Sequence, residues 1–174
     1  MKKQIIIFTD SGDTIVDEET QQIDENDIVI SAELIPGAKQ TLLELYREGY
    51  RIALVADGKW DSFQNVFRQH GLLDCFEALI VSERVGCEKP DAKMFDEAMK
   101  QMKLTQKDKQ KIVMIGNNLK KDIAGANRFG ITSVWLNWSK RYYHTIEEPD
   151  WKATYEISLP KELPDLLAKL EKQI

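Results

Sequence analysis

Charged residues that could do chemistry follow four of the apolar runs in this chain. Asp10 comes directly after QIIIFT, and Asp57 and Gly58 come directly after RIALVA. Further along, Lys89 lies in the segment GCEKPD, and Asp122 lies in GNNLKKD. Carboxylate oxygens bind Mg²⁺, and a lysine ammonium can neutralise both a nucleophilic carboxylate and a phosphoryl group in transfer. These residue types would therefore suit Mg²⁺-dependent phosphoryl transfer if the fold brought them together.

The spacing of apolar residues predicts strands and helices in alternation. The expected strands are residues 4–9, 51–56, 79–81, 112–115, 131–136 and 155–157. The expected helices lie between them, at about 36–49, 62–70, 90–102 and 119–129. Alternation at this spacing implies right-handed crossovers and a mostly parallel sheet covered on both faces. The predicted fold class is α/β, a doubly wound, Rossmann-like sheet in three α/β/α layers.

In sheets of this kind, ligands bind beyond the carboxyl ends of the strands. Asp10, Asp57, Lys89 and Asp122 all follow predicted strands, so we expect them to meet at one edge of the sheet. A single aspartate after a strand is most often a turn or helix-cap residue. The prediction therefore depends on the group and not on any one member.

Composition limits the classes of function that need considering. The chain has 174 residues, 43% of them hydrophobic, which fits one domain, residues 1–174, with a substantial core. A net charge of −5 argues against broad attraction to nucleic acid or membranes. Cys75 and Cys87 form no CxxC pair, no apolar stretch approaches the roughly 20 residues of a membrane span, and the start lacks a secretory pattern. We expect a cytoplasmic protein.

Four segments, in order, resemble the motifs of the haloacid dehalogenase (HAD) superfamily. DSGDTIVDE is similar to the family's DxDGTLVD, and LVADG resembles its second motif. SERVGCEKPDAKMF resembles the lysine motif, and MIGNNLKKD is similar to GDxxxxD. The resemblance implies a HAD-like hydrolase, with phosphatase activity and Mg²⁺ as cofactor.

The resemblance also implies a role for particular residues. Asp10 would be the nucleophile that forms an aspartyl-phosphate, and Lys89 would be its catalytic partner. The implied Mg²⁺ ligands are Asp10, the backbone carbonyl of Gly12, Asn117 and Asp122. The implied substrate-binding residues are Ala56, Asp57, Gly58 and Lys89.

Three positions depart from the family pattern. Gly12 stands where the family has an acid–base aspartate, Ala56 replaces a hydroxyl residue, and Asn117 replaces a metal-binding aspartate. Asp13 could replace the lost acid, but lies one residue too far along the turn. These changes predict a slow phosphatase. The alternatives are a catalytically impaired protein that binds a phosphorylated ligand or a protein partner, and a dehalogenase, whose leaving group needs no proton.

The segment available for a cap domain is short. Only an acidic flap, residues 17–34, stands between the first motif and the next helix, so the chain resembles the capless subgroup. An open site of this kind accepts a phosphorylated substrate of unknown size, or is closed by a second subunit or a protein partner. The segment WSKRYYH, residues 138–144, either binds such a substrate or is an ordinary loop.

Overall fold

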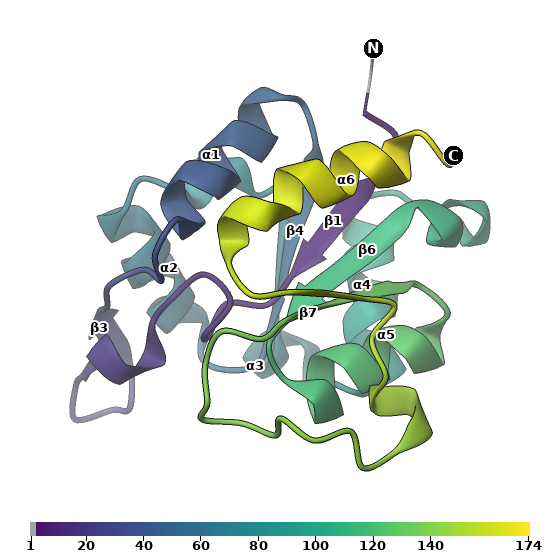
Figure 1. The fold of residues 1–174 in the computed structure, drawn as a ribbon. Helices are drawn as coiled ribbons and strands as arrows, with labels where there is room; N and C mark the ends of the chain where they lie inside the picture. Colours follow the sequence, from purple (N-terminus) through teal and green to yellow (C-terminus); the bar gives the residue numbers. More distant parts are fainter. Residues whose placement is uncertain (1–2) are drawn as a thin grey trace.

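A parallel sheet of six strands forms the centre of the molecule (Figure 1). The computed structural model describes residues 3–174, and the first two residues of the predicted domain lie outside this range. The strand order is β5-β4-β1-β6-β7-β8, and every neighbouring pair is parallel. The strands are β1 (Ile6–Thr9), β4 (Arg51–Ala56), β5 (Ala78–Val81), β6 (Ile112–Gly116), β7 (Thr132–Leu136) and β8 (Tyr155–Ile157). The predicted α/β class is confirmed.

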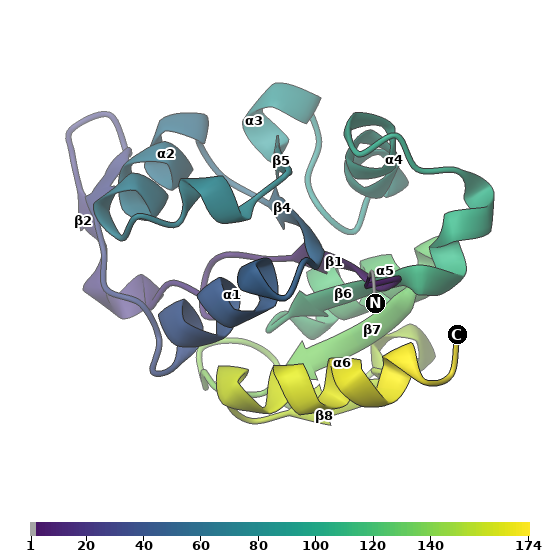
Figure 2. The ribbon, with the colours of Figure 1, turned by 90° about the horizontal axis from the view of Figure 1, so that it is seen from above.

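Helices cover both faces of the sheet (Figure 2). On one face, α1 (Ala38–Arg47), α2 (Trp60–Gln69) and α6 (Leu163–Glu171) pack on side chains such as Ile7 and Leu54. On the other face, α4 (Ala92–Gln101) and α5 (Ala124–Phe129) pack on Phe8 and Val55. Because successive residues of a strand point to opposite faces, the central strands must be apolar throughout. The continuous apolar runs in the sequence have this cause.

Two helical segments differ from the prediction. The segment predicted as one helix over 119–129 begins with a turn of π-helix, Leu119–Ile123, and only then continues as α5. The Asn118 side chain accepts hydrogen bonds from the backbone N–H groups of Lys120 and Lys121, which fixes the start of this turn. A four-residue helix, α3 (Ser82–Val85), was not predicted, because it is too short to show a periodic pattern.

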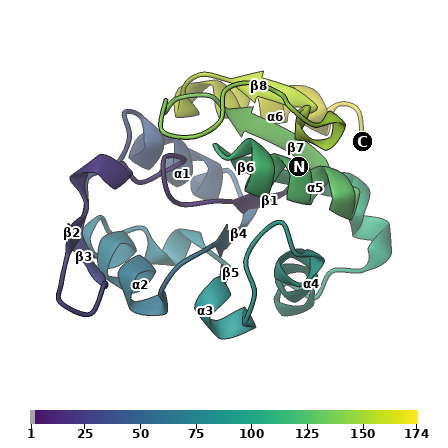
Figure 3. The ribbon, with the colours of Figure 1, turned by 90° about the horizontal axis from the view of Figure 1, so that it is seen from below.

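The acidic flap folds as a small hairpin, β2 (Gln22–Ile23) and β3 (Val29–Ser31), that lies beside α2 (Figure 3). The Val29 N–H donates to Ser62 Oγ at 2.9 Å, and Asn65 Nδ2 donates to the Val29 carbonyl at 3.1 Å. The charged tip is exposed, but these bonds hold the hairpin to the helix. The flap is therefore a folded element and forms one side of the cavity described below.

The two ends of the described chain lie close together, far from the carboxyl ends of the strands (Figure 1). The backbone N–H groups of Gln4 and Ile5 each donate to Glu171 Oε1 at 2.9 Å, which ties the residues just before β1 to α6. Within residues 3–174, none of the helices has the length and apolar character that a bilayer crossing requires.

Candidate active site

A lysine buried between two carboxylates forms the centre of the candidate site. Lys89 Nζ lies 2.7 Å from Asp10 Oδ1 and 2.8 Å from Asp122 Oδ1, and it also donates to the Val55 carbonyl at 2.7 Å. The Lys89 and Asp122 side chains are each 1% exposed, whereas that of Asp10 is 14% exposed. Three residues from distant parts of the sequence thus meet at the carboxyl edge of the sheet, as predicted, with Asp10 nearest to solvent.

The charges in this group depend on one another. Burial opposes a charge on Lys89, but Asp10 and Asp122 outweigh it and raise the pKa of the lysine, so Lys89 stays an ammonium. Burial, and then the charge of Asp10, raise the pKa of Asp122 to about 7. Removing Lys89 would leave two carboxylates close together without their counter-ion. The arrangement therefore depends on the lysine.

Asp122 reaches Lys89 because Gly116 has no side chain. A Cβ atom at position 116, at the end of β6, would overlap Asp122 Cγ. The backbone N–H of Asn118 donates to Asp122 Oδ2 at 3.0 Å, which fixes the second carboxylate oxygen. The glycine of the GNNLKKD segment is thus required by packing.

The three predicted substrate-binding residues at the end of β4 and just after it differ in their surroundings. Asp57 accepts from the backbone N–H of Lys89 and from Lys121 Nζ, both at 3.0 Å. Gly58 lines the cavity, and its N–H donates to Ser82 Oγ at 2.8 Å. Ala56 is 1% exposed, belongs to the hydrophobic core and does not line the cavity. Asp57 therefore positions two lysines, and the substrate-binding role of all three residues stays a prediction.

Gly12 lies against the flap residue Glu18. A Cβ atom built on Gly12 would be 2.6 Å from Glu18 Cδ and would overlap Glu18 Oε1. Gly12 does not have a positive φ, so its backbone does not itself require a glycine. The Glu18 carboxyl group occupies the space that a side chain at position 12 would fill. Burial, and then the nearby Asp13 and Asp10, raise the pKa of Glu18, and a hydrogen bond from Tyr142 partly opposes this.

Asp13 does not line the cavity. Its side chain is fully buried, and it pairs with Arg141, whose Nε lies 2.8 Å from Oδ2. Burial raises the pKa of Asp13, but the bonds from Arg141, Ser139 and the Glu18 backbone outweigh it, so the pKa is lowered overall. Asp13 is therefore an ionised structural residue here.

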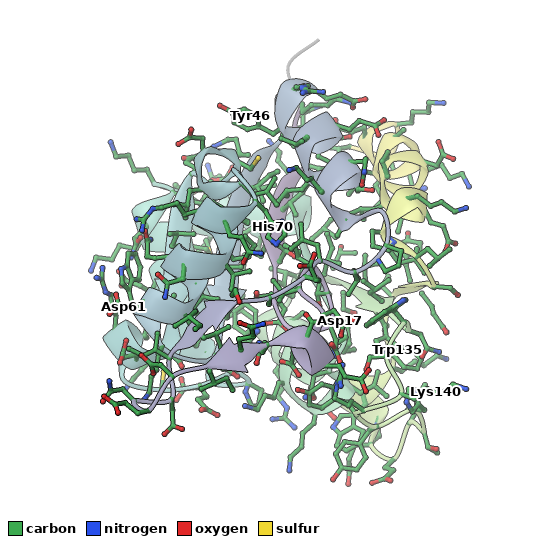
Figure 4. All side chains as sticks on the ribbon, turned by 90° about the vertical axis from the view of Figure 1, so that its left-hand side faces the viewer. Asp17, Tyr46, Asp61, His70, Trp135 and Lys140 are labelled. Carbon is green, nitrogen blue, oxygen red and sulfur yellow. The ribbon has the colours of Figure 1, made fainter. Side chains whose placement is uncertain are left out.

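The loop after β7 holds the flap. Arg141 Nη2 also lies 3.2 Å from Asp17 Oδ1, and Tyr142 OH donates to Glu18 Oε2 at 2.5 Å. Figure 4 shows Asp17 of the flap and Lys140 of this loop on the same side of the molecule. The sequence left two interpretations of WSKRYYH, a substrate-binding segment or an ordinary loop. The structure adds a third, because this loop pairs with carboxylates of the first motif and the flap.

These residues surround one cavity of about 360 Å³. Among its lining residues are Asp10, Gly12, Glu18, Asp57, Gly58, Lys59, Lys89, Asn117, Asn118, Lys121, Asp122 and Tyr142. The sequence analysis did not select Glu18, Lys59, Asn118, Lys121 or Tyr142. A signal existed for two of them: Asn118 directly follows the selected Asn117, and Lys121 directly precedes the selected Asp122. None existed for Glu18 and Tyr142, whose contact spans 124 positions in the sequence.

The oxygen atoms that line the cavity are suitable ligands for one hard cation. Asp10, Gly12, Asn117 and Asp122 all line it, and together they bear carboxylate, carbonyl and amide oxygens. Five carboxylates and three lysines line the cavity, so negative charge is in excess before a substrate enters. In residues 3–174, no three His, Cys, Asp or Glu side chains are grouped to hold a metal. The oxygen atoms of Asp10, Gly12, Asn117 and Asp122 are of the kind that suits a single Mg²⁺.

The match to known proteins agrees with this geometry. Residues 2–130 match the family model of the haloacid dehalogenase-like hydrolases. The chain belongs to this family. A glyceraldehyde 3-phosphate phosphatase of Pyrococcus furiosus is 34% identical over 140 residues, which are 80% of this chain and 55% of the relative. A (S)-2-haloacid dehalogenase of Pseudomonas is 30% identical over 115 residues, 66% of this chain and 48% of the relative.

The likeness in fold to a solved structure extends to the C-terminal strand and helix. The crystal structure of an uncharacterised protein from Listeria monocytogenes superposes with a TM-score of 0.78, at 23% identity, and covers 97% of this chain and 99% of its own. By contrast, this chain spans about half the length of the two named enzymes. Their activities are therefore a guide to a proposal for this protein.

Proposed function

We propose that this HAD-like protein is a phosphoester hydrolase that works through an aspartyl-phosphate on Asp10, with Mg²⁺ as its cofactor. The observation that supports this best is the position of Asp10: its carboxylate lies on the cavity, with Oδ1 held 2.7 Å from Lys89 Nζ. A carboxylate held in this way keeps one oxygen, Oδ2, for attack on phosphorus. The phosphatase among the relatives gives further support.

Each step is then assigned to residues of this chain. Asp10 attacks the phosphoryl group, and Lys89 offsets the charge that collects on the nucleophile and the phosphoryl oxygens. Lys121, held by Asp57, binds a phosphoryl oxygen in place of the hydroxyl that Ala56 lacks. Asp10, the Gly12 carbonyl, Asn117 and Asp122 would hold Mg²⁺, which when bound supplies further positive charge to the phosphoryl oxygens.

Two features favour a low rate. Ala56 offers no hydroxyl donor, and Asn117 brings no charge to the metal site. Both changes remove electrostatic stabilisation of the transition state, which is often the largest contribution to catalysis. We therefore expect slow hydrolysis. The cytoplasmic location stays a prediction from the sequence.

A phosphatase assay with and without Mg²⁺, on the wild type and on Asp10→Asn, tests the proposal. We expect nitrophenol release from 4-nitrophenyl phosphate that needs Mg²⁺ and is lost in Asp10→Asn. Equal rates from the two proteins would contradict the proposal. In that case phosphate binding without turnover would favour the impaired binding protein, and chloride release from 2-chloropropionate would favour dehalogenation.

A further inference from the structure

We propose that Glu18 is the general acid and base of this site and replaces the carboxylate that position 12 lacks. The proposal rests on the phosphatase function proposed above. It assigns a catalytic role to a flap residue, the last residue of the DSGDTIVDE segment, which has no counterpart in the pattern DxDGTLVD.

The position of Glu18 is the first support for this role. The space beyond the Gly12 Cα, where a side chain of residue 12 would begin, is filled by Glu18 Oε1 and Cδ. If residue 12 were an aspartate, its side chain would begin at this same point. Glu18 brings a carboxyl group to the same place from six residues further along the chain, and both residues line the cavity with Asp10.

Three other carboxylates near Asp10 are already committed, and Asp27, which also lines the cavity, is exposed at the hairpin tip. Asp13 is fully buried and paired with Arg141, and it does not line the cavity. Asp57 accepts from the Lys89 backbone and from Lys121, and Asp122 is paired with Lys89. Glu18 has no lysine or arginine within salt-bridge distance among residues 3–174. It is the carboxyl group best placed to give and take a proton.

Tyr142 positions this carboxyl group. Its hydroxyl donates to Glu18 Oε2 at 2.5 Å, while Oε1 is the oxygen that lies at Gly12. The Glu18 backbone N–H also donates to Asp13 Oδ1 at 3.1 Å, which fixes the start of the flap. One oxygen is thus held by the tyrosine, and the other is available for proton transfer.

The proton transfers balance over the two steps. In the first, Asp10 Oδ2 bonds to phosphorus, the bond to the leaving oxygen breaks, and that oxygen takes the proton from Glu18 to leave as an alcohol. In the second, water attacks the phosphorus of the aspartyl-phosphate and gives a proton to the Glu18 carboxylate. The bond to Asp10 then breaks, inorganic phosphate leaves, and both side chains return to their first state.

The test compares Glu18→Gln with the wild type on two substrates. An alkyl phosphate, glycerol phosphate, needs an acid for its leaving group, whereas 4-nitrophenyl phosphate does not. We expect Glu18→Gln to lose about 10²–10⁴-fold on the alkyl substrate, the usual contribution of a positioned acid–base group. On the aryl substrate it should release up to one equivalent of nitrophenol per site and then stall, because the second step lacks its base. The wild type should show no such burst.

Glu19→Gln is the matched control, because it removes the same charge from the neighbouring, exposed flap residue. It should retain wild-type rates on both substrates. If Glu18→Gln fails to fold, Tyr142→Phe gives a second measurement, since it removes only the positioning hydroxyl. It should lower the rate on glycerol phosphate more than the rate on nitrophenyl phosphate.

A rescue variant separates catalysis from structure. Gly12→Asp combined with Glu18→Ala moves the carboxylate to position 12, and it should recover hydrolysis of glycerol phosphate that Glu18→Ala alone has lost. Equal losses of the first-turnover rate on both substrates in Glu18→Gln, a loss reversed by excess Mg²⁺, or a wild type limited to the aryl substrate would each overturn the role of Glu18. A wild type no more active than Asp10→Asn would instead overturn the proposed function itself.

Discussion

Asp13 and Arg141 form a two-point ion pair that joins the first motif to the loop after β7. Nε lies 2.8 Å from Oδ2, and Nη2 lies 3.1 Å from Oδ1. The carboxylate is fully buried, while the arginine side chain is 36% exposed. The pair spans 128 positions in the sequence, and the same arginine also binds Asp17 of the flap. The loop and the flap are therefore held in place together.

Arg141→Ala should lower the free energy of unfolding by about 2 kcal/mol, because it leaves a buried carboxylate without its main partner. Asp13 has a lowered pKa in the folded protein, so its contribution to stability is present above its ordinary value of 3.8 and is lost as the pH falls below it. The difference between the two proteins should therefore shrink at acid pH. Urea unfolding at several pH values measures it. Lys140→Ala, on the same loop, is the control, and an equal loss there would count against the ion pair.

Gly12→Ala should destabilise the protein by about 1–3 kcal/mol, the usual cost of overpacking, because the new methyl group overlaps Glu18. Glu18→Ala should relieve this clash. In the double variant, the cost of Gly12→Ala should fall close to zero. A double-mutant cycle by chemical denaturation gives the coupling directly, and additive effects would mean that Glu18 does not fill this space.

Asn117→Asp should tighten Mg²⁺ binding about tenfold, since a third carboxylate offsets more of the cost of dehydrating the ion. Asn118→Asp is a close control, because it adds the same charge one residue away and can still accept the two bonds that cap the π-helical turn. Calorimetric titration with Mg²⁺ should separate the two variants. A larger gain from Asn118→Asp would remove Asn117 from the set of metal ligands.

Lys89→Met should cost about 3–5 kcal/mol of stability near pH 8, the usual effect of leaving buried charges unpaired. The loss should be smaller at pH 5.5, because Asp122, whose pKa is raised to about 7, can then be protonated and leave one charge fewer unpaired. Lys120→Met, an exposed neighbour of the site, should change little at either pH. Thermal and urea unfolding at the two pH values measure this. A pH-independent loss would show that Lys89 acts through packing instead of charge.

The order of strands and helices could be predicted because each element has a local cause. Residues 51–56 and 155–157 form strands at the predicted bounds, since buried parallel strands are short apolar runs between turn residues. The meeting of Asp10, Lys89 and Asp122 follows from topology alone, because all three come after parallel strands of one sheet.

The contacts that complete the site could not be predicted in this way. Glu18 lies at Gly12, and Arg141 at Asp13, because the start of the flap and a long loop fold over the sheet edge, and no periodic pattern describes such segments. The same limit applies to the glycine at position 12. From the sequence, Gly12 marks the loss of an acid. In the structure, the absence of a side chain at Gly12 leaves space that the Glu18 carboxylate occupies.

Mass spectrometry of the quenched protein tests the central claim most directly. Glu18→Gln is mixed with 4-nitrophenyl phosphate and Mg²⁺, quenched in acid within the first turnover, and digested. We predict one added phosphoryl group on the peptide that contains Asp10, less of it in the wild type, and none in Asp10→Asn or Lys89→Met. An unmodified Asp10 peptide in a protein that releases nitrophenol, or a phosphoryl group on another residue, would contradict the account.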